Sequence, residues 1–382
     1  MLRSLVQAAP VRPDRSALAE LAELAGEAFH RCYQCGTCSV VCPLTPHEQA
    51  FPRKEMVWAQ WGLTDKLLSD PDVWLCHQCN RCSTYCPTNA RPGDLMAAVR
   101  NYQIIHYATP SFLAQPAVAL KYLPLAFVLP ILIVLGIVFT AVVLPNGGFV
   151  YPDGPIMFQH WIDHWYIIGA STVAHGFSFL VAAVALRRFW ANIQQHAGTE
   201  DGQGETRGIV PSFLSTLQDI FSHSRFKDCG ADEPRYPAHM GIFYGFLFLF
   251  AATNGAFIYT AMGKDLSLPL TDPVKIIGNL GFLLMFGGLT AVTLRRLNQP
   301  QSAGRSIYFD WFFIGLLWAV IMTGIFLEAI RMAGLKDIAY PFYLVHLVFI
   351  YTLYVYLPVS KFAHLLYRTT ALTWAKHVGR LP

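Results

Sequence analysis

The sequence predicts an all-α fold, in which a small helical domain rich in cysteine is followed by a bundle of six transmembrane helices. The composition is that of a membrane protein, because 54% of the 382 residues are hydrophobic and 14% are charged, against roughly 25% charged residues in ordinary soluble domains. Eight of the nine cysteines fall between Cys32 and Cys86. Six apolar stretches follow them, and each reaches the roughly 20 residues that a transmembrane helix needs.

Residues 1–110 are predicted to form a soluble helical domain. Leu18, Leu21, Leu24 and Ala28 recur at helical spacing, which indicates an amphipathic helix before the first cysteines. Residues 1–30 lack the apolar core of a secretory signal, so we expect this domain to stay in the cytoplasm. In that reducing compartment, clustered cysteines indicate metal binding rather than disulfides.

Residues 111–382 are predicted to form the membrane domain. Basic residues of short loops are retained on the cytoplasmic side of a membrane, and most Lys and Arg between the spans, such as Arg187 and Arg295, fall on the side of the N-terminal domain. This pattern predicts a multi-pass protein of the cytoplasmic membrane with both termini in the cytoplasm. The expected spans are 121–144, 163–186, 239–262, 274–294, 309–330 and 340–366.

Two copies of the motif C-x2-C-x2-C-x3-C-P are the most specific signal in the chain. In ferredoxins this spacing lets three successive thiolates bind one [4Fe-4S] cubane, while the fourth cysteine of each run binds the other cluster. Zinc ribbons use paired C-x2-C knuckles instead, and Cys229, which stands apart, is interpreted as a structural cysteine. The predicted ligands are Cys32, Cys35, Cys38 and Cys86 for cluster one, and Cys76, Cys79, Cys82 and Cys42 for cluster two.

Five histidines lie in or at the ends of the predicted spans, where ionisable groups are costly and usually functional. A b-type haem held by two histidines needs imidazoles from different helices at matching depth. Counted from the cytoplasmic ends of the helices, His239 and His364 match as ligands of an inner haem, and His164 and His346 as ligands of an outer haem. His175 is the alternative partner of His346. Because some of these histidines could only hydrogen-bond between helices, the sequence predicts either one haem b or two.

Glu328 and Arg331 lie at the outer end of the fifth predicted span. Quinol oxidation releases protons, so a quinone site needs a proton acceptor, and a single carboxylate among apolar residues suits that role. The same Glu could instead be an interfacial residue hydrogen-bonded to a helix end. Nucleic-acid binding is not expected, because the net charge is only +4 and no basic run is interleaved with aromatics.

Both halves of the chain resemble known redox proteins. Residues 32–38 and 74–79 resemble the iron–sulfur subunit of heterodisulfide reductases. Residues 223–229, followed by Arg235, His239 and 245–247, resemble the haem-binding membrane subunit of those enzymes, itself similar to the nitrate reductase γ subunit. Their fusion is similar to the fused iron–sulfur and haem b subunit of quinone-interacting membrane-bound oxidoreductase complexes. That resemblance implies two b haems, menaquinone as the membrane partner, flavin- and iron–sulfur-containing cytoplasmic subunits, and a link to adenylylsulfate reductase in dissimilatory sulfur metabolism.

The sequence therefore predicts an electron-transfer subunit between menaquinone and a cytoplasmic partner, without a complete catalytic site for the terminal reaction. The alternative is a membrane anchor and iron–sulfur relay of a heterodisulfide reductase-like complex that has no quinone site. One departure weakens the haem assignment: Leu249 stands where the nitrate reductase γ pattern has a second haem histidine on the helix of His239. The outer haem would then take its ligand from another helix.

Overall fold

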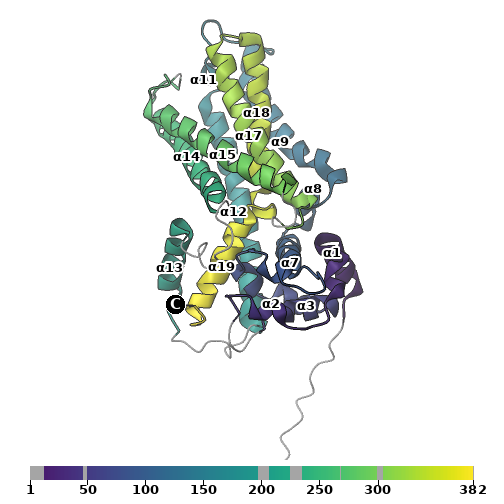
Figure 1. Ribbon diagram of the computed structural model, residues 1–382. Helices are drawn as coiled ribbons and strands as arrows, with labels where there is room; N and C mark the ends of the chain where they lie inside the picture. The colour runs from purple at the N-terminus through teal and green to yellow at the C-terminus, as the bar shows by residue number, and fades with distance from the viewer. Residues whose placement is uncertain are drawn as a thin grey trace, which may run out of the picture. The chain divides into compact units, whose positions relative to one another are not determined.

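The computed structural model describes residues 13–45, 50–196, 206–223, 235–266, 268–298 and 304–381 (Figure 1). Within these ranges every regular element is a helix, which confirms the predicted fold class. Six helical segments are long and apolar enough to cross a membrane. The chain divides into two compact units, one formed by Met1–Tyr107, Leu186–Ala231 and His364–Pro382, and the other by Ala108–Ala185 and Asp232–Ala363.

The first unit begins with α1 (Arg15–Ala25), which the Asp14 carboxylate caps by accepting hydrogen bonds from the backbone of Ser16 and Ala17. The helix ends earlier than its apolar spacing suggested, because Gly26 adopts a positive φ of 77° and a short 3-10 turn follows. The other main helices are α3 (Arg53–Gln60) and α7 (Pro92–Tyr107), and the short α2 (Thr37–Val40), α5 (Asp72–Leu75) and α6 (Arg81–Thr84) accompany the cysteines.

Two helices that start in the second unit complete the core of the first. The end of α12 (His164–His196) supplies Phe189, and α19 (Ala363–His377) supplies Tyr367. Tyr367 stacks on Trp74 with ring centroids 5.1 Å apart, and Phe189 packs edge-on against Trp74 and at a tilt against Tyr367. The sequence predicts a domain boundary after residue 110 and does not show that distant segments complete this unit.

A further helix of the first unit, α13 (Ile209–Ser222), is fixed to α19. Lys376 donates to the Ser215 hydroxyl at 2.6 Å and pairs with the Asp219 carboxylate at 2.9 Å. The two helices lie side by side in Figure 1. The long loop between the second and third spans therefore contributes ordered structure to the unit that carries the cysteines.

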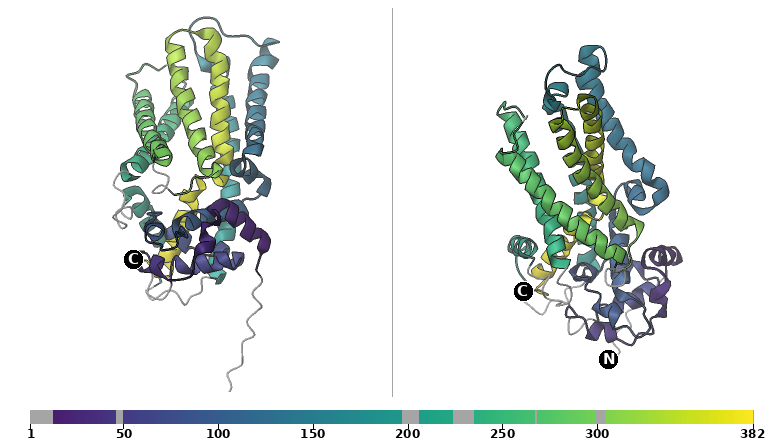
Figure 2. Two further views of the ribbon diagram at one scale, coloured as in Figure 1. Left: turned by 45° about the vertical axis from the view of Figure 1, so that its right-hand side comes forward. Right: turned by 45° about the horizontal axis from the view of Figure 1, so that its top comes forward.

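The second unit contains the spans. They are α9 (Leu123–Val138, continued to Asn146 by a π-helical turn and α10), α12, α14 (Arg235–Ala261), α15 (Pro273–Asn298), α17 (Tyr308–Met332) and α18 (Lys336–Tyr356). Helix α12 runs ten residues beyond the predicted end at 186, because the apolar span passes directly into the Phe189-containing segment of the first unit. Helix α18 packs between α9 and α17, as Figure 2 shows.

The expected sixth span, 340–366, lies within the sixth candidate span, Lys336–His377, but it is not one continuous helix. Helix α18 ends at Tyr356, a 3-10 turn covers Leu357–Val359, and α19 begins at Ala363. Pro358 explains the break, since proline lacks the N–H that a helix interior requires. Lys361, in the connecting segment, is held by the buried Asp310 carboxylate at 2.7 Å, which fixes the chain at the turn.

Helices α14 and α15 form a hairpin whose backbones approach closely at glycines. A Cβ on Gly245 would lie 2.7 Å from the Met285 nitrogen, and one on Gly288 would lie 2.7 Å from the Ala238 carbonyl oxygen. Small residues at the contact let transmembrane helices associate through backbone packing, and Figure 2 shows the two helices running together. This contact fixes the position of α14, the helix that carries His239.

Candidate iron–sulfur and membrane redox sites

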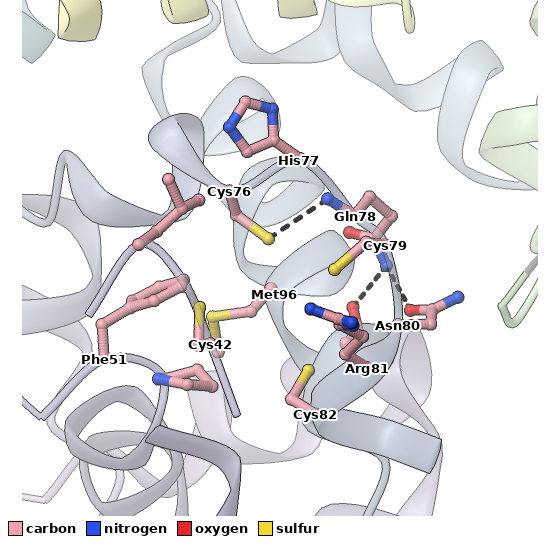
Figure 3. Close-up of a pocket in the computed structure, with 13 residues that line it drawn as sticks. Cys42, Phe51, Cys76, His77, Gln78, Cys79, Asn80, Arg81, Cys82 and Met96 are labelled. Carbon is pink, nitrogen blue, oxygen red and sulfur yellow. Dashed lines mark hydrogen bonds between the residues drawn. The ribbon is translucent and has the colours of Figure 1, made fainter. Parts of the chain in front are cut away.

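Four of the predicted cluster ligands surround one cavity in the first unit. Cys42, Cys76, Cys79 and Cys82 line a small common cavity together with Met96 and other side chains. Their sulfur atoms turn toward this common space (Figure 3). Cys42 comes from the first motif and the other three from the second, which is the exchange expected for cluster two.

Left-handed backbone conformations shape the loop before α6. Gln78 and Asn80 have positive φ values of 54° and 60°, so the chain coils tightly enough to turn Cys76, Cys79 and Cys82 inward. The backbone N–H of Gln78 donates to the Cys76 sulfur at 3.4 Å, and the side-chain amide of Gln78 donates to the Gly93 carbonyl at 2.7 Å. The loop is therefore anchored to the start of α7.

The chemistry of this donor set fits a [4Fe-4S] cluster. Burial raises the pKa of the Cys42 and Cys82 thiols above its usual value, because a free thiolate would lack solvation there. Binding to iron supplies the positive charge that stabilises buried thiolates. Four converging thiols and the adjoining amide donor thus suit a cubane, whereas an oxygen-liganded cation would find no matching ligands among the four.

The other four cysteines form a second group with a different exposure. Burial is the largest cause of the raised pKa of Cys32, and the neighbouring Cys86 and Cys35 thiols raise it further. Burial also raises the pKa of Cys38 to about 11. Cys86 of the second motif therefore lies near Cys32 of the first motif, as expected for cluster one. Cys35, in contrast, is exposed, and a hydrogen bond from Thr37 lowers its pKa. None of the eight cysteines forms a disulfide.

Two arginines that sequence reasoning missed bind the loop of cluster two. Arg368 of α19 donates to the carbonyls of Trp74 and Cys76 at 3.0 and 2.9 Å, and its guanidinium lies 3.3 Å from His77 Nδ1. Arg100 of α7 donates to the same Cys76 carbonyl at 3.3 Å. The only sequence signal was the position of Arg368 one helical turn after His364.

Among the membrane histidines, His346 has the clearest support. Its Nδ1 lies 2.8 Å from the Thr323 hydroxyl on α17, and a Cβ at Gly324 would lie 3.3 Å from the ring. A hydrogen bond at Nδ1 fixes the ring and leaves Nε2 as the ligand atom, as in many metal-binding histidines. Helix α17 thus orients this side chain.

The two candidate partners of His346 lie on α12 at different levels. His175 bonds the Ser171 carbonyl through Nδ1 at 2.7 Å and packs on Tyr354, with ring centroids 4.0 Å apart. Tyr351 contacts Ile167 and Ser171 of α12, so the two helices run in the same direction. In this register His164, at the start of α12, lies nearer the level of His346. The pairing of His346 with either residue stays a prediction.

The predicted ligands of the inner haem belong to different units. His239 lies near the start of α14 in the second unit, whereas His364 lies at the start of α19 in the first. Their pairing stays a prediction. Cys229 lies outside the described residues.

Glu328 forms an ion pair that the sequence did not indicate. Its carboxylate pairs with Lys275 Nζ at 3.1 Å, rather than with Arg331, which follows it on α17. The other oxygen, Oε1, is buried and has no hydrogen-bond partner among the described residues. Lys275 opens α15 and is remote from Glu328 in sequence, so helical spacing on α17 could not reveal it.

Most of the chain matches models of known protein families. Residues 118–380 match the family model described as Citrate utilization protein B. The chain belongs to this CitB family. Residues 28–90 of this CitB-family chain match the model of a 4Fe-4S dicluster domain, so the cysteine region is an iron–sulfur electron-transfer domain, joined to a multi-pass membrane domain.

A curated relative adds a functional context. The chain is 30% identical over 146 residues to one subunit of the dihydromethanophenazine:CoB–CoM heterodisulfide reductase of Methanosarcina barkeri. The match covers 35% of this chain and 55% of the relative, so the chain spans about half the length of that protein. No solved structure matches the chain.

Proposed function

We propose that this CitB-family chain relays electrons between a membrane quinone and a cytoplasmic redox partner through haem b and two [4Fe-4S] clusters. The observation that carries the proposal is the convergence of Cys42 with Cys76, Cys79 and Cys82 on one cavity. The described residues of the same chain include six helices long and apolar enough to cross a membrane. The clusters supply one-electron transfer when bound.

The two cluster sites differ in a way that supports an order for the relay. Cluster two would be enclosed and bound to α19 through Arg368. Cluster one would reach the surface at Cys35, and the neighbours of its ligands, Tyr33, Val40 and Tyr85, are exposed by 62, 87 and 60%. Exposed aromatic and apolar side chains are typical of protein contacts. Cluster one would therefore exchange electrons with the soluble partner.

The ion pair between Lys275 and Glu328 supports a quinone site at the outer ends of α15 and α17. The Lys275 ammonium can donate a hydrogen bond to a quinone carbonyl oxygen, and the unpartnered Oε1 of Glu328 can accept a proton from the quinol hydroxyl. Both groups lie in membrane-spanning helices, where charged side chains are usually functional. Arg331 becomes a secondary candidate.

The haem ligands we propose are His346 with His164 or His175 for an outer haem, and His239 with His364 for an inner haem. The bond from His346 to Thr323 supports the first site because it leaves Nε2 for iron. If the protein binds one haem instead of two, we propose the outer site, because the hydrogen bond between His346 and Thr323 supports it. The chain's residues then orient the ligand and exclude water around it.

The finer identity rests on resemblance. The relative's name couples a reduced phenazine to a heterodisulfide, which supports a membrane electron carrier on one side and a cytoplasmic reaction on the other. We propose menaquinone as the carrier, flavin- and iron–sulfur-containing subunits as partners, and the cytoplasm as the location of the cluster domain. A link to adenylylsulfate reductase, as in quinone-interacting oxidoreductase complexes, is part of this proposal.

A reduced-minus-oxidised spectrum of the purified protein tests the proposal. A menaquinol analogue should produce a haem b band, and dithionite should add little to it. A band with dithionite alone would leave haem without a working quinone site, and no band at all would favour the alternative of an anchor with an iron–sulfur relay.

The Glu328→Gln variant tests the quinone site separately. It should slow quinol-driven haem reduction by at least about 100-fold, the usual contribution of a general base, while the dithionite-reducible haem content stays constant. Asp337→Asn is the matched control, because this carboxylate is exposed at the start of α18. Equal rates in the two variants would contradict the role of Glu328.

A further inference from the structure

The segment from Val73 to Gln78 is bound by two cations that come from different parts of the sequence. Arg100 donates to the carbonyls of Val73 and Cys76 and to the Gln78 side chain. Arg368 donates to the carbonyls of Trp74 and Cys76. The Cys76 carbonyl therefore accepts hydrogen bonds from both guanidinium groups, at 3.3 and 2.9 Å.

This arrangement brings positive charge next to a predicted cluster ligand. Arginine stays protonated in proteins, and both side chains are only partly exposed, so solvent and salt screen them less than surface charges. The backbone carbonyls would otherwise turn the negative ends of their dipoles toward the loop. Each hydrogen bond to a guanidinium offsets that negative potential.

We propose that Arg368 and Arg100 raise the reduction potential of cluster two, so that it accepts an electron before cluster one. The proposal rests on the proposed function, because it requires Cys42, Cys76, Cys79 and Cys82 to hold a cluster. Reduction adds one negative charge, and nearby positive charge stabilises the reduced form more than the oxidised form. Charge and hydrogen bonding near the sulfurs are established controls of cluster potentials.

Arg368 also has a structural role, the attachment of α19, and this role must be distinguished from the effect of its charge. Helix α19 is held to the same region by Arg380, which donates to the buried Asp72 carboxylate at 2.7 Å. If Arg368 served only to attach α19, replacing Arg368 or replacing Arg380 would have the same effect on the reduction potential of cluster two. If its charge acts on cluster two, only the Arg368 variant shifts the potential.

The test is an equilibrium redox titration of the full-length protein, followed by the electron paramagnetic resonance of the reduced clusters. In the unmodified protein, one cluster should be reduced before the other. Arg368→Gln should lower the equilibrium constant for reduction of that first cluster by about tenfold, which is about 59 mV for one electron. The other cluster should not shift.

Three further variants make the result decisive. Arg368→Lys keeps the charge and should shift the potential less than Arg368→Gln. Arg380→Gln should leave both potentials unchanged. Arg100→Gln removes the second cation from the Cys76 carbonyl and should shift the same cluster in the same direction, which tests the proposal even if Arg368→Gln binds less iron.

The outcomes distinguish this inference from the proposed function. An unmodified protein with far less than about eight iron atoms per chain would overturn both. Full iron content with unchanged potentials in Arg368→Gln and Arg100→Gln would overturn only the role of the arginines. An equal shift in Arg380→Gln would also overturn it, since the effect would then follow from attachment of α19.

Discussion

Lys54 is the residue whose replacement tests the electrostatics of the first unit most directly. Its ammonium lies 2.5 Å from the Asp72 carboxylate, 3.5 Å from Asp70 and 3.3 Å from Glu55, and all three carboxylates are buried. Burial opposes its charge, but Asp70 and Asp72 hold the pKa of Lys54 above its usual value. Arg380 provides the second cation of this cluster.

The magnitude follows from the charge balance. Burial raises the pKa of Glu55 well above its usual value, so this side chain stays protonated. At Asp72, the positive charges of Lys54 and Arg380 outweigh the effect of burial and lower the pKa of the carboxyl group. In Lys54→Met, Asp70 must take up a proton. Protonating an Asp with a reference pKa near 3.9 at pH 7 costs about 4 kcal/mol, at about 1.4 kcal/mol per unit.

Burial already raises the pKa of Asp70 while Lys54 is present, so the expected loss in the free energy of unfolding at pH 7 is at most about 4 kcal/mol. This loss becomes smaller by about 1.4 kcal/mol for each pH unit toward acid. Chemical denaturation of the detergent-solubilised protein, followed by loss of iron–sulfur absorbance, measures it. Lys66→Met is the control, since its cation lies 5.6 Å from the Trp58 ring. A loss below about 1 kcal/mol, or equal losses at pH 5 and pH 7, would refute the reasoning.

Three other predictions concern packing and protonation. Gly245→Leu should separate α14 from α15 and lower the melting temperature, because a Cβ there already lies 2.7 Å from the Met285 nitrogen. Gly93→Ala should reduce iron content by disturbing the cluster-two loop, because its Cβ would clash with Asn80 Oδ1. Glu55→Gln should increase stability at pH 8 but not at pH 4. The raised pKa of Glu55 means that the unfolded chain releases its proton first as the pH rises.

Each of these has its own control. Gly287→Leu, on α15 in open space, should melt close to the unmodified protein, and equal melting of the Gly245 variant would contradict the backbone contact. Gly136→Ala, also in open space, is the control for iron content, which should fall only in the Gly93 variant. A Glu55→Gln variant with the same pH profile as the unmodified protein would show that Glu55 is ionised when folded.

Local patterns were sufficient to predict the fold class. The structure places Cys42, Cys76, Cys79 and Cys82 around one cavity, while the assignment of the eight cysteines to two clusters stays a prediction. Each motif carries its turn geometry in a few adjacent residues. Gln34 and Gly36 repeat the positive φ values found at Gln78 and Asn80. Such turns depend on nearest neighbours and are visible in one sequence.

Contacts between distant segments could not be predicted in the same way. Hydropathy stays high over 340–366 and so did not show the break in the helix at Pro358. The bond between Lys361 and Asp310, which holds the chain after this break, depends on a contact with another helix. Lys275 as partner of Glu328, and Arg368 at the Cys76 carbonyl, likewise depend on how helices pack. Helical spacing on a single segment contains no information about either contact.

The contribution of α19 to the first unit has a consequence for the order of biosynthesis. Trp74 lacks its stacking partner Tyr367, and Asp72 lacks Arg380, until the ribosome has made the sixth span and the helix that follows it. An N-terminal segment released early would expose Trp74 and leave the carboxylates of Asp70 and Asp72 with Lys54 alone. Maturation of the iron–sulfur part should therefore finish only after the membrane helices have been synthesised.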